Sequence, residues 1–133
     1  MLDVCKITGS KLFHISTDEV YGSIKQGSFS EDDKLNPQNP YAATKASAEF
    51  LVKSYANTHN IEYLMVRPSN NFGPRQNSEK FIPTILNSLT SGSKVPIYGD
   101  GNNVRDWLYV KDNVAAILFI LENSNVNEIY NIS

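Results

Sequence analysis

Short apolar runs recur along the chain and predict buried strands. Residues 11–16 (KLFHIS), 61–67 (IEYLMVR) and 128–132 (EIYNI) have the length and the apolar content of strands inside a sheet. Residues 95–98 and 104–110 are two further candidates. Several of these runs are bounded by glycine, proline or asparagine, which favour turns. The pattern therefore predicts several short strands.

Helical patterns separate these strands. Pro40 is preorganised for a first helical turn, and the alanines, Glu49 and Lys53 that follow are good helix formers. Asp112 and Asn113 are expected to cap a later helix. The expected helices cover residues 2–8, the segment from Pro40 to its end at 57–60, residues 81–89 and residues 114–122. Helices that alternate with strands in this way indicate an α/β fold with a parallel sheet.

Two long polar segments follow the first two strands. Residues 17–39 follow the first strand, and residues 69–78 (SNNFGPRQNS) follow the second. Ligands of parallel sheets bind beyond the carboxyl ends of the strands, and loops of this length in compact domains are usually functional or mobile. The segment that begins at Thr17 is therefore the first place to search for a site.

The densest chemical signal is the heptad STDEVYG at residues 16–22. A hydroxyl and the two carboxylates of Asp18 and Glu19 could serve as hydrogen-bond donor, general acid and general base. The same residues could equally form a solvated turn with a hydroxyl or Asx cap. From the heptad alone, both interpretations stay open.

A second signal is the spacing of Tyr41 and Lys45. Residues four apart on a helix lie on the same face, and an ammonium beside a phenol favours the phenolate. A phenol with its ordinary pKa of about 10 needs such help to act as a base near neutral pH. The alternative is a packed tyrosine and a lysine directed to solvent. The motif and the preceding heptad reinforce each other.

Composition and charge narrow the class of protein. The 133 residues are 41% apolar and 20% charged, which is typical of about one small globular domain. Twelve basic and fourteen acidic residues give a net charge of -2 without a Lys/Arg run, so no nucleic-acid partner is expected. The longest apolar run, 114–121, is too short to cross a membrane. The single Cys5 fits a reducing cytosol, and one cysteine with two histidines leaves little for a transition-metal site.

Five segments together resemble a known family: STDEVYG, NPYAATKASAE, RPSNNFGPRQNSEKFIP, PIYGDGNNVRDWLYVKDN and EIYNIS. They are similar to extended short-chain dehydrogenases/reductases of the NAD-dependent epimerase/dehydratase family, and within it to the dTDP-glucose 4,6-dehydratases. The resemblance runs from about residue 10 to residue 133. YxxxK marks the superfamily alone. The Thr-Asp-Glu triplet is more specific, because epimerases carry a serine-rich segment there and sugar-acid decarboxylases carry Thr-Ser-Glu.

The resemblance implies a partial Rossmann-like fold. Family members begin with a strand, a GxxGxxG loop and a helix that bind the NAD pyrophosphate, and this sequence contains no such motif. Gly99 and Gly101 are followed by Val104 where a third glycine is needed. The chain is therefore expected to be the central portion of a longer enzyme and inactive as an isolated fragment. Residues 1–92 would be the C-terminal half of the NAD-binding domain, with its catalytic loop and helix, and residues 93–133 would be part of the sugar-nucleotide-binding region.

The resemblance also implies a reaction, the dehydration of a nucleotide-linked glucose to its 4-keto-6-deoxy form, with NAD regenerated in each turnover. Tyr41 would take the proton of the 4-hydroxyl, Thr17 would hydrogen-bond that hydroxyl, and Lys45 would hold the nicotinamide ribose and lower the pKa of Tyr41. Glu19 would then remove the proton on carbon 5, and protonated Asp18 would donate to the departing 6-hydroxyl.

Binding residues follow from the same matched segments. The resemblance assigns the cofactor to Ser16, Tyr41, Lys45 and Asn71, and the substrate to Thr17, Asn70, Lys80, Phe81, Pro96, Ile97, Tyr98 and Arg105. Lys80 and Arg105 would meet the diphosphate, and residues 96–98 would line the nucleotide base pocket. The alternatives are a local ion pair between Arg105 and Asp106 and an ordinary edge strand at 96–98.

The remaining expectations concern the core and the assembly. Six apolar residues are expected in the core: Phe13, Val66, Ile85, Trp107, Leu108 and Ile117. His14 is expected to be a buried histidine with its hydrogen bonds satisfied. The whole enzyme would be a cytoplasmic homodimer. A related UDP-sugar dehydratase or decarboxylase, and a catalytically inactive binding or folding module, remain the alternative functions.

Overall fold

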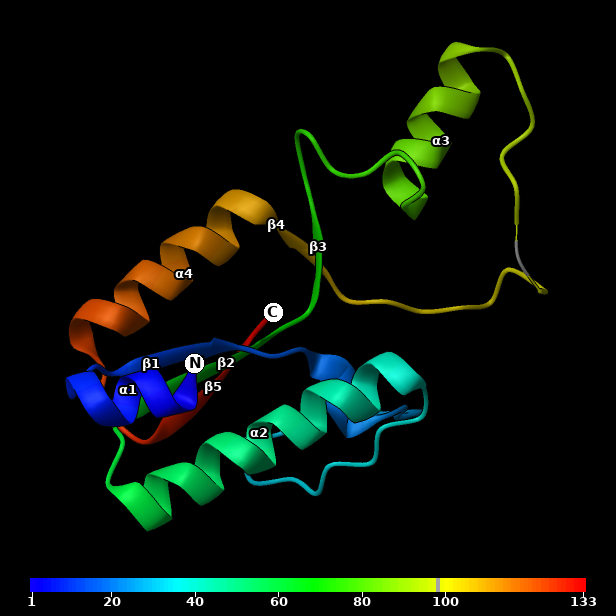
Figure 1. Ribbon diagram of the computed structural model, residues 1–133. Helices are drawn as coiled ribbons and strands as arrows, with labels where there is room; N and C mark the ends of the chain where they lie inside the picture. The colour runs from blue at the N-terminus through cyan, green and yellow to red at the C-terminus, as the bar shows by residue number, and fades with distance from the viewer. Residues whose placement is uncertain (98) are drawn as a thin grey trace.

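Helices cover both faces of a small parallel sheet in this structure, a computed structural model that describes residues 1–97 and 99–133. The sheet has three strands in the order β1–β2–β5 (Figure 1). These strands are Leu12–Ile15, Tyr63–Pro68 and Glu128–Ile132. Both neighbouring pairs are parallel, so the carboxyl ends of the strands meet at one edge. The predicted α/β fold with a parallel sheet is confirmed.

Each face of the sheet has its own helical layer. The helices are α1 (Leu2–Thr8) and α2 (Pro40–His59) on one face and α4 (Val110–Asn123) on the other (Figure 1). β2 is the central strand, and all of its residues are buried. Its side chains alternate between the faces, so that Met65 shares a core cluster with Val52 of α2, and Leu64 shares one with Ile120 of α4. β2 therefore holds the two layers together.

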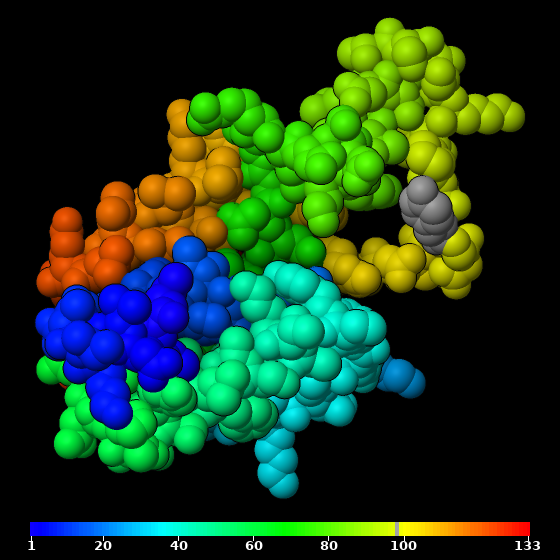
Figure 2. All heavy atoms as spheres, in the orientation of Figure 1, coloured from blue at the N-terminus to red at the C-terminus, as the bar shows by residue number. Residues whose placement is uncertain are grey.

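A second, two-stranded parallel sheet continues beyond β2. Its elements and the neighbouring helix are β3 (Asn70–Phe72), α3 (Phe81–Thr90) and β4 (Trp107–Tyr109). α3 lies apart from the three-stranded sheet, and Figure 2 shows it as part of a separate lobe. α3 contacts β4 at its first residue, Phe81, whose ring stacks on the ring of Trp107 with 6.2 Å between centroids.

Several sequence-predicted boundaries are confirmed, and local chemistry explains them. β5 has the predicted bounds. α2 begins at Pro40, and the side chain of Asn39 caps it by accepting from the backbone N–H of Ala42 at 2.8 Å. α1 ends where Gly9 adopts the left-handed conformation, with φ 67°.

Other predicted elements are wrong. The polar segment 69–78 contains a strand, β3, because Asn70 to Phe72 pair with β4. Residues 95–97 form no strand and have no pairing partner in the part of the chain that is described, while Tyr98 lies outside the described residues. The run 104–110 is a strand only at 107–109. α4 begins at Val110 rather than after Asp112 and Asn113, which lie in its first turns.

The predicted core is correct for most of its members. Val66 and Leu108 are buried, and Phe13, Ile85 and Ile117 are partly buried. Trp107 is 39% exposed, because its ring covers Phe81 on the surface rather than entering the core. His14 is half-buried, and burial lowers its pKa. Its Nε2 atom is buried without a partner among the described residues, so the expected satisfied histidine is wrong for that atom.

Strands from the two predicted segments share sheets. β4 pairs with β3 and β5 pairs with β2, so that residues 93–133 contribute to both sheets begun by residues 1–92. The division at residue 92 stays a prediction. Within the described residues, no helix has both the length and the apolar content needed to cross a membrane. No cluster of three or more potential metal ligands occurs in that same part.

Candidate functional site

Polar groups gather where β1 and β2 end. The backbone N–H of Ser16 donates to the carbonyl of Val66 at 2.8 Å and thus continues the sheet beyond β1. Ser69 follows β2 in the same way and donates to the carbonyl of Ile132 at 2.9 Å. The hydroxyl oxygens of Ser16 and Ser69 are both buried without a partner in the described part of the chain. Such unpaired buried hydroxyls are available to a ligand.

The next residues turn into a short 3₁₀ helix, η1 (Asp18–Tyr21). Thr17 caps η1, because its Oγ1 accepts from the backbone N–H of Glu19 at 3.3 Å, and its hydroxyl donates to Asp18 Oδ1 at 3.3 Å. Gly22 ends η1 with φ 86°, and a Cβ atom there would lie 2.5 Å from the carbonyl oxygen of Asn36. Only glycine fits this close approach.

The two carboxylates of η1 lie in unlike environments. Burial raises the pKa of Asp18 above its ordinary 3.8, and the charges of Glu19 and Asp106 raise it further, against the opposing hydrogen bond from Thr17. Glu19 instead accepts a hydrogen bond from Asn39 Nδ2 at 2.8 Å. Asn39 therefore caps α2 with its oxygen and holds Glu19 with its nitrogen. Two carboxylates whose environments differ in this way suit an acid and a base.

Helix α2 brings Tyr41 and Lys45 to the same edge. Lys45 Nζ donates to the carbonyl of Ile15, the last residue of β1, at 3.0 Å. The same ammonium lies 6.0 Å from the centroid of the Tyr41 ring. Tyr41 is 52% exposed, so its phenol is accessible from outside. The helical spacing and the bond to β1 thus place a cation beside an exposed phenol.

A cleft of about 820 Å³ opens beside η1. Asp18, Glu19, Asn70 and Arg105 line it, together with residues 21–29 on one side. Tyr41 and Lys45 do not line the cleft, although Asn39, directly before α2, does. The structure therefore brings two predicted catalytic residues and two predicted substrate residues to one cleft.

The other predicted binding residues lie elsewhere. The side chain of Asn71 is engaged within the chain, since it donates to the carbonyl of Ser69 at 3.0 Å and accepts from Asn113 Nδ2 at 2.8 Å. Lys80 is exposed directly before α3, Phe81 stacks on Trp107, and Pro96 and Ile97 are exposed. The predicted Tyr98 lies outside the described residues. Arg105 donates to the carbonyl of Val104 at 2.8 Å and forms no ion pair with Asp106.

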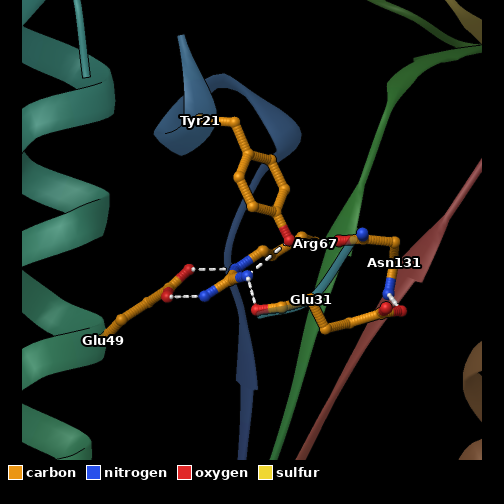
Figure 3. Close-up of polar contacts among 5 residues, drawn as sticks. All are labelled: Tyr21, Glu31, Glu49, Arg67 and Asn131. Carbon is orange, nitrogen blue, oxygen red and sulfur yellow. Dashed lines mark hydrogen bonds and ion pairs between the residues drawn. The ribbon is translucent and has the colours of Figure 1, made fainter. Parts of the chain in front are cut away.

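Sequence reasoning missed the residues that support this site. Asn39 carries a recognisable signal, an N-cap residue directly before a first-turn proline. Glu49 also carries one, because its spacing from Ala42, Ala46 and Val52 puts it on the buried face of α2. Arg67 carries none, because it stands inside the apolar run of β2. It forms an ion pair with Glu49 (Figure 3).

Comparison with known proteins identifies the family of the chain. Residues 1–133 match the family described as "NAD dependent epimerase/dehydratase family". This chain belongs to the NAD-dependent epimerase/dehydratase family. Its Rossmann-like character is confirmed by the crystal structure of dTDP-glucose 4,6-dehydratase from Bacillus anthracis in complex with NAD, which has a TM-score of 0.95 at 45% identity over 98% of this chain and 43% of that one.

Curated members of the epimerase/dehydratase family are similar over most of the chain. The low-salt glycan biosynthesis protein Agl12 of Haloferax volcanii is 52% identical over 122 residues, which are 92% of this chain and 39% of that protein. The dTDP-glucose 4,6-dehydratase of Streptomyces griseus is 44% identical over 133 residues, 99% of this chain and 40% of that protein. The chain thus spans about 40% of the length of these relatives.

The residues at the sheet edge of this epimerase/dehydratase chain offer donor groups that fit a nucleotide cofactor such as NAD. Ser16 contributes a buried hydroxyl without a partner. Lys45 contributes an ammonium held by the carbonyl of Ile15, which leaves its other N–H groups free to donate to a ribose hydroxyl. Tyr41 contributes an exposed phenol at the same place. Donors of this kind at the carboxyl ends of parallel strands suit a nucleotide cofactor.

Proposed function

We propose that the whole protein containing this segment is an NAD-dependent nucleotide-sugar 4,6-dehydratase, a lyase whose substrate is dTDP-glucose. The observation that carries the proposal is the pair Asp18 and Glu19, held in unlike environments at one cleft that is also lined by Asn39, the residue directly before α2. A dehydratase needs an acid and a base at neighbouring carbons of one sugar, and this pair supplies both.

The first half of the reaction uses the α2 residues. Tyr41 Oη accepts the proton of the sugar 4-hydroxyl, and the Lys45 ammonium lies 6.0 Å from the centroid of the Tyr41 ring. Thr17 hydrogen-bonds the same hydroxyl. Ser16, Tyr41, Lys45 and Asn71 are the residues that we assign to NAD. When bound there, NAD would supply a reversible acceptor for the hydride that leaves carbon 4.

The second half uses the carboxylates. Glu19, held by Asn39, removes the proton on the carbon beside the new ketone. Asp18 donates its proton to the departing 6-hydroxyl, which leaves as water. Burial supports this role, because the raised pKa of Asp18 increases the fraction of that carboxyl that carries a proton near neutral pH. As the hydride returns to carbon 6, the proton on Glu19 returns to the carbon beside the ketone. The proton that Tyr41 took from the 4-hydroxyl then replaces the one that Asp18 gave to the departing water, so the sugar loses one water overall.

The remaining contacts and the assembly belong to the same proposal. Asn70 contacts the sugar, Lys80 and Arg105 contact the diphosphate, and Phe81 and residues 96–98 complete the nucleotide-binding side. The whole protein is proposed to be a cytoplasmic homodimer. The apolar side chains of Phe50 and Leu51, which are exposed on α2, support the homodimer. The single cysteine of these residues, Cys5, supports the cytoplasmic location.

The test is a product assay on the purified full-length protein with NAD. dTDP-glucose and UDP-glucose are supplied in parallel, and the 4-keto-6-deoxy sugar is followed by mass spectrometry. Tyr41→Phe should abolish product, whereas Tyr55→Phe, at the far end of α2, should not. Product from UDP-glucose alone would overturn the assignment of the nucleotide, and no dehydration of either sugar would overturn the proposed function.

A further inference from the structure

A buried ion pair lies behind the candidate site. Arg67 of β2 and Glu49 of α2 are each 1% exposed. Their contact is bidentate, with Nε to Oε1 at 3.0 Å and Nη2 to Oε2 at 2.6 Å (Figure 3). Burying two charges is costly unless every donor and acceptor is used, so the other partners of Arg67 indicate what the pair does.

The remaining nitrogen of Arg67 reaches the residues that form the cleft. Nη1 donates to Tyr21 Oη at 2.5 Å and to the carbonyl of Glu31 at 3.1 Å. Tyr21 Oη in turn donates to Asn131 Oδ1 of β5 at 2.8 Å. Figure 3 shows the guanidinium between Glu49 on one side and Tyr21 and Glu31 on the other. Tyr21 is the last residue of η1, so Arg67 connects α2 directly to η1.

A second set of hydrogen bonds connects the cleft wall to Asn131, the residue that accepts from Tyr21. Asn131 N–H donates to Glu31 Oε1 at 2.8 Å, and Asn131 Nδ2 donates to the carbonyl of Phe29 at 3.2 Å. The ring of Phe29 stacks on Tyr21 with 4.8 Å between centroids. The wall of the cleft, η1, β5 and α2 therefore all meet at Arg67.

Packing alone does not orient η1. Val20 and Tyr21 pack on Ala46 of α2, which sets the separation of the two elements. Apolar contact has no preferred direction, whereas hydrogen bonds are directional. Asn39 fixes Glu19 at the start of α2, and Tyr21 fixes the other end of η1 through Arg67. Directional bonds therefore hold η1 at both of its ends.

We propose that Arg67 is a positioning residue, which acts through Glu49 and Tyr21 to fix η1, with Asp18 and Glu19, relative to α2, with Tyr41 and Lys45. The inference rests on the proposed function, in which both sets of groups act on one sugar. A misplacement of about 1 Å among such groups can cost about a hundredfold in rate. Lys45 is held to β1 independently, so loss of the Tyr21 contact should affect the carboxylates more than the α2 residues.

The test uses Tyr21→Phe in the full-length protein, with Tyr55→Phe as the matched control. Tyr21→Phe removes one hydroxyl and leaves both bonds between Arg67 and Glu49. Tyr55→Phe removes a hydroxyl that bonds Asp3 at 3.4 Å, far from the cleft. Two quantities are measured: transient NADH against dehydrated product in a single turnover, and hydrogen exchange of the peptide covering residues 16–22 without ligand.

Tyr21→Phe should slow dehydration about tenfold to a hundredfold while transient NADH still forms. Exchange across residues 16–22 should be faster, and Tyr55→Phe should change neither quantity. Arg67→Lys should cause the same split at least as strongly, because one ammonium cannot replace the planar fork. If Arg67→Lys does not fold, Tyr21→Phe alone decides the question.

Three outcomes would overturn the inference: an unchanged dehydration rate in Tyr21→Phe, unchanged exchange across residues 16–22, or an equal loss of both steps in proportion to the folded fraction. The failure of the proposed function looks different. In that case the unsubstituted protein forms neither NADH nor dehydrated sugar, and faster exchange in Tyr21→Phe would still support the anchoring of η1 by Arg67.

Discussion

Glu49→Ala is expected to be strongly destabilising, because it leaves the guanidinium of Arg67 buried without its charge partner. Both side chains are 1% exposed, so neither water nor salt screens the pair. Breaking a buried pair by removing one partner costs about 3–5 kcal/mol. Native proteins are stable by only about 5–15 kcal/mol in total, so the loss is a large share of that stability.

The double substitution Glu49→Leu with Arg67→Met distinguishes this explanation from loss of packing. It removes both charges and keeps most of the side-chain volume, so it should recover most of the stability lost in Glu49→Ala. Urea unfolding of the full-length protein, followed by fluorescence and by far-UV circular dichroism, measures the free energy of unfolding. Glu122→Ala on the exposed surface of α4 is the control and should change stability by less than about 0.5 kcal/mol.

Two results would refute this reasoning. One is a loss below about 1 kcal/mol in Glu49→Ala, which would mean that Arg67 finds water or another acceptor. The other is a double variant as unstable as Glu49→Ala, which would mean that shape rather than charge governs this position.

Three further predictions concern the site and the segment. Asp18→Asn should slow dehydration while transient NADH still forms. Asp18→Asn should also stabilise the protein at neutral pH, because the raised pKa of Asp18 makes the free energy of unfolding fall as pH rises through that pKa. When the free energy of unfolding is measured against pH, the gain should vanish below the ordinary pKa of 3.8. In thermal unfolding, Gly22→Ala should lower the free energy of unfolding by about 1–3 kcal/mol. The loss should exceed that of Gly27→Ala, because both glycines have positive φ but only a Cβ at Gly22 would lie 2.5 Å from a backbone oxygen. Residues 1–133 alone should not turn over a sugar nucleotide, because they contain no glycine-rich turn for the NAD pyrophosphate; tight NAD binding in calorimetry together with turnover would contradict this.

The elements that the sequence predicted well are those with strong local signals. An N-cap residue and a first-turn proline mark the start of α2, and β5 is a short apolar run between asparagine and serine. β3 is polar and exists because β4 pairs with it, which no local pattern reveals. Conversely, the run at 95–97 has strand-like residues but lacks a neighbour among the described residues, and Ile97 stays 69% exposed. Pairing over long separations decided both cases.

The candidate site shows the same division. Asp18, Glu19, Tyr41 and Lys45 could be predicted because their spacing within two short segments carries their chemistry. Arg67 could not, because its partners come from three distant parts of the chain and its own surroundings in sequence are apolar. The groups proposed to react were thus visible in the sequence, while the groups that hold them in place required the fold.

The double use of Asn39 has a consequence for the chemical ageing of the protein. Among good N-cap residues, only asparagine carries an acceptor and a donor on one planar group, and both are used here. Deamidation to aspartate would keep the cap but set a second negative charge against Glu19. Spontaneous deamidation proceeds by attack of the following backbone nitrogen on the side-chain amide, and Pro40 has no N–H with which to make that attack. The proline that begins α2 therefore also protects the amide that holds Glu19 over the lifetime of the molecule.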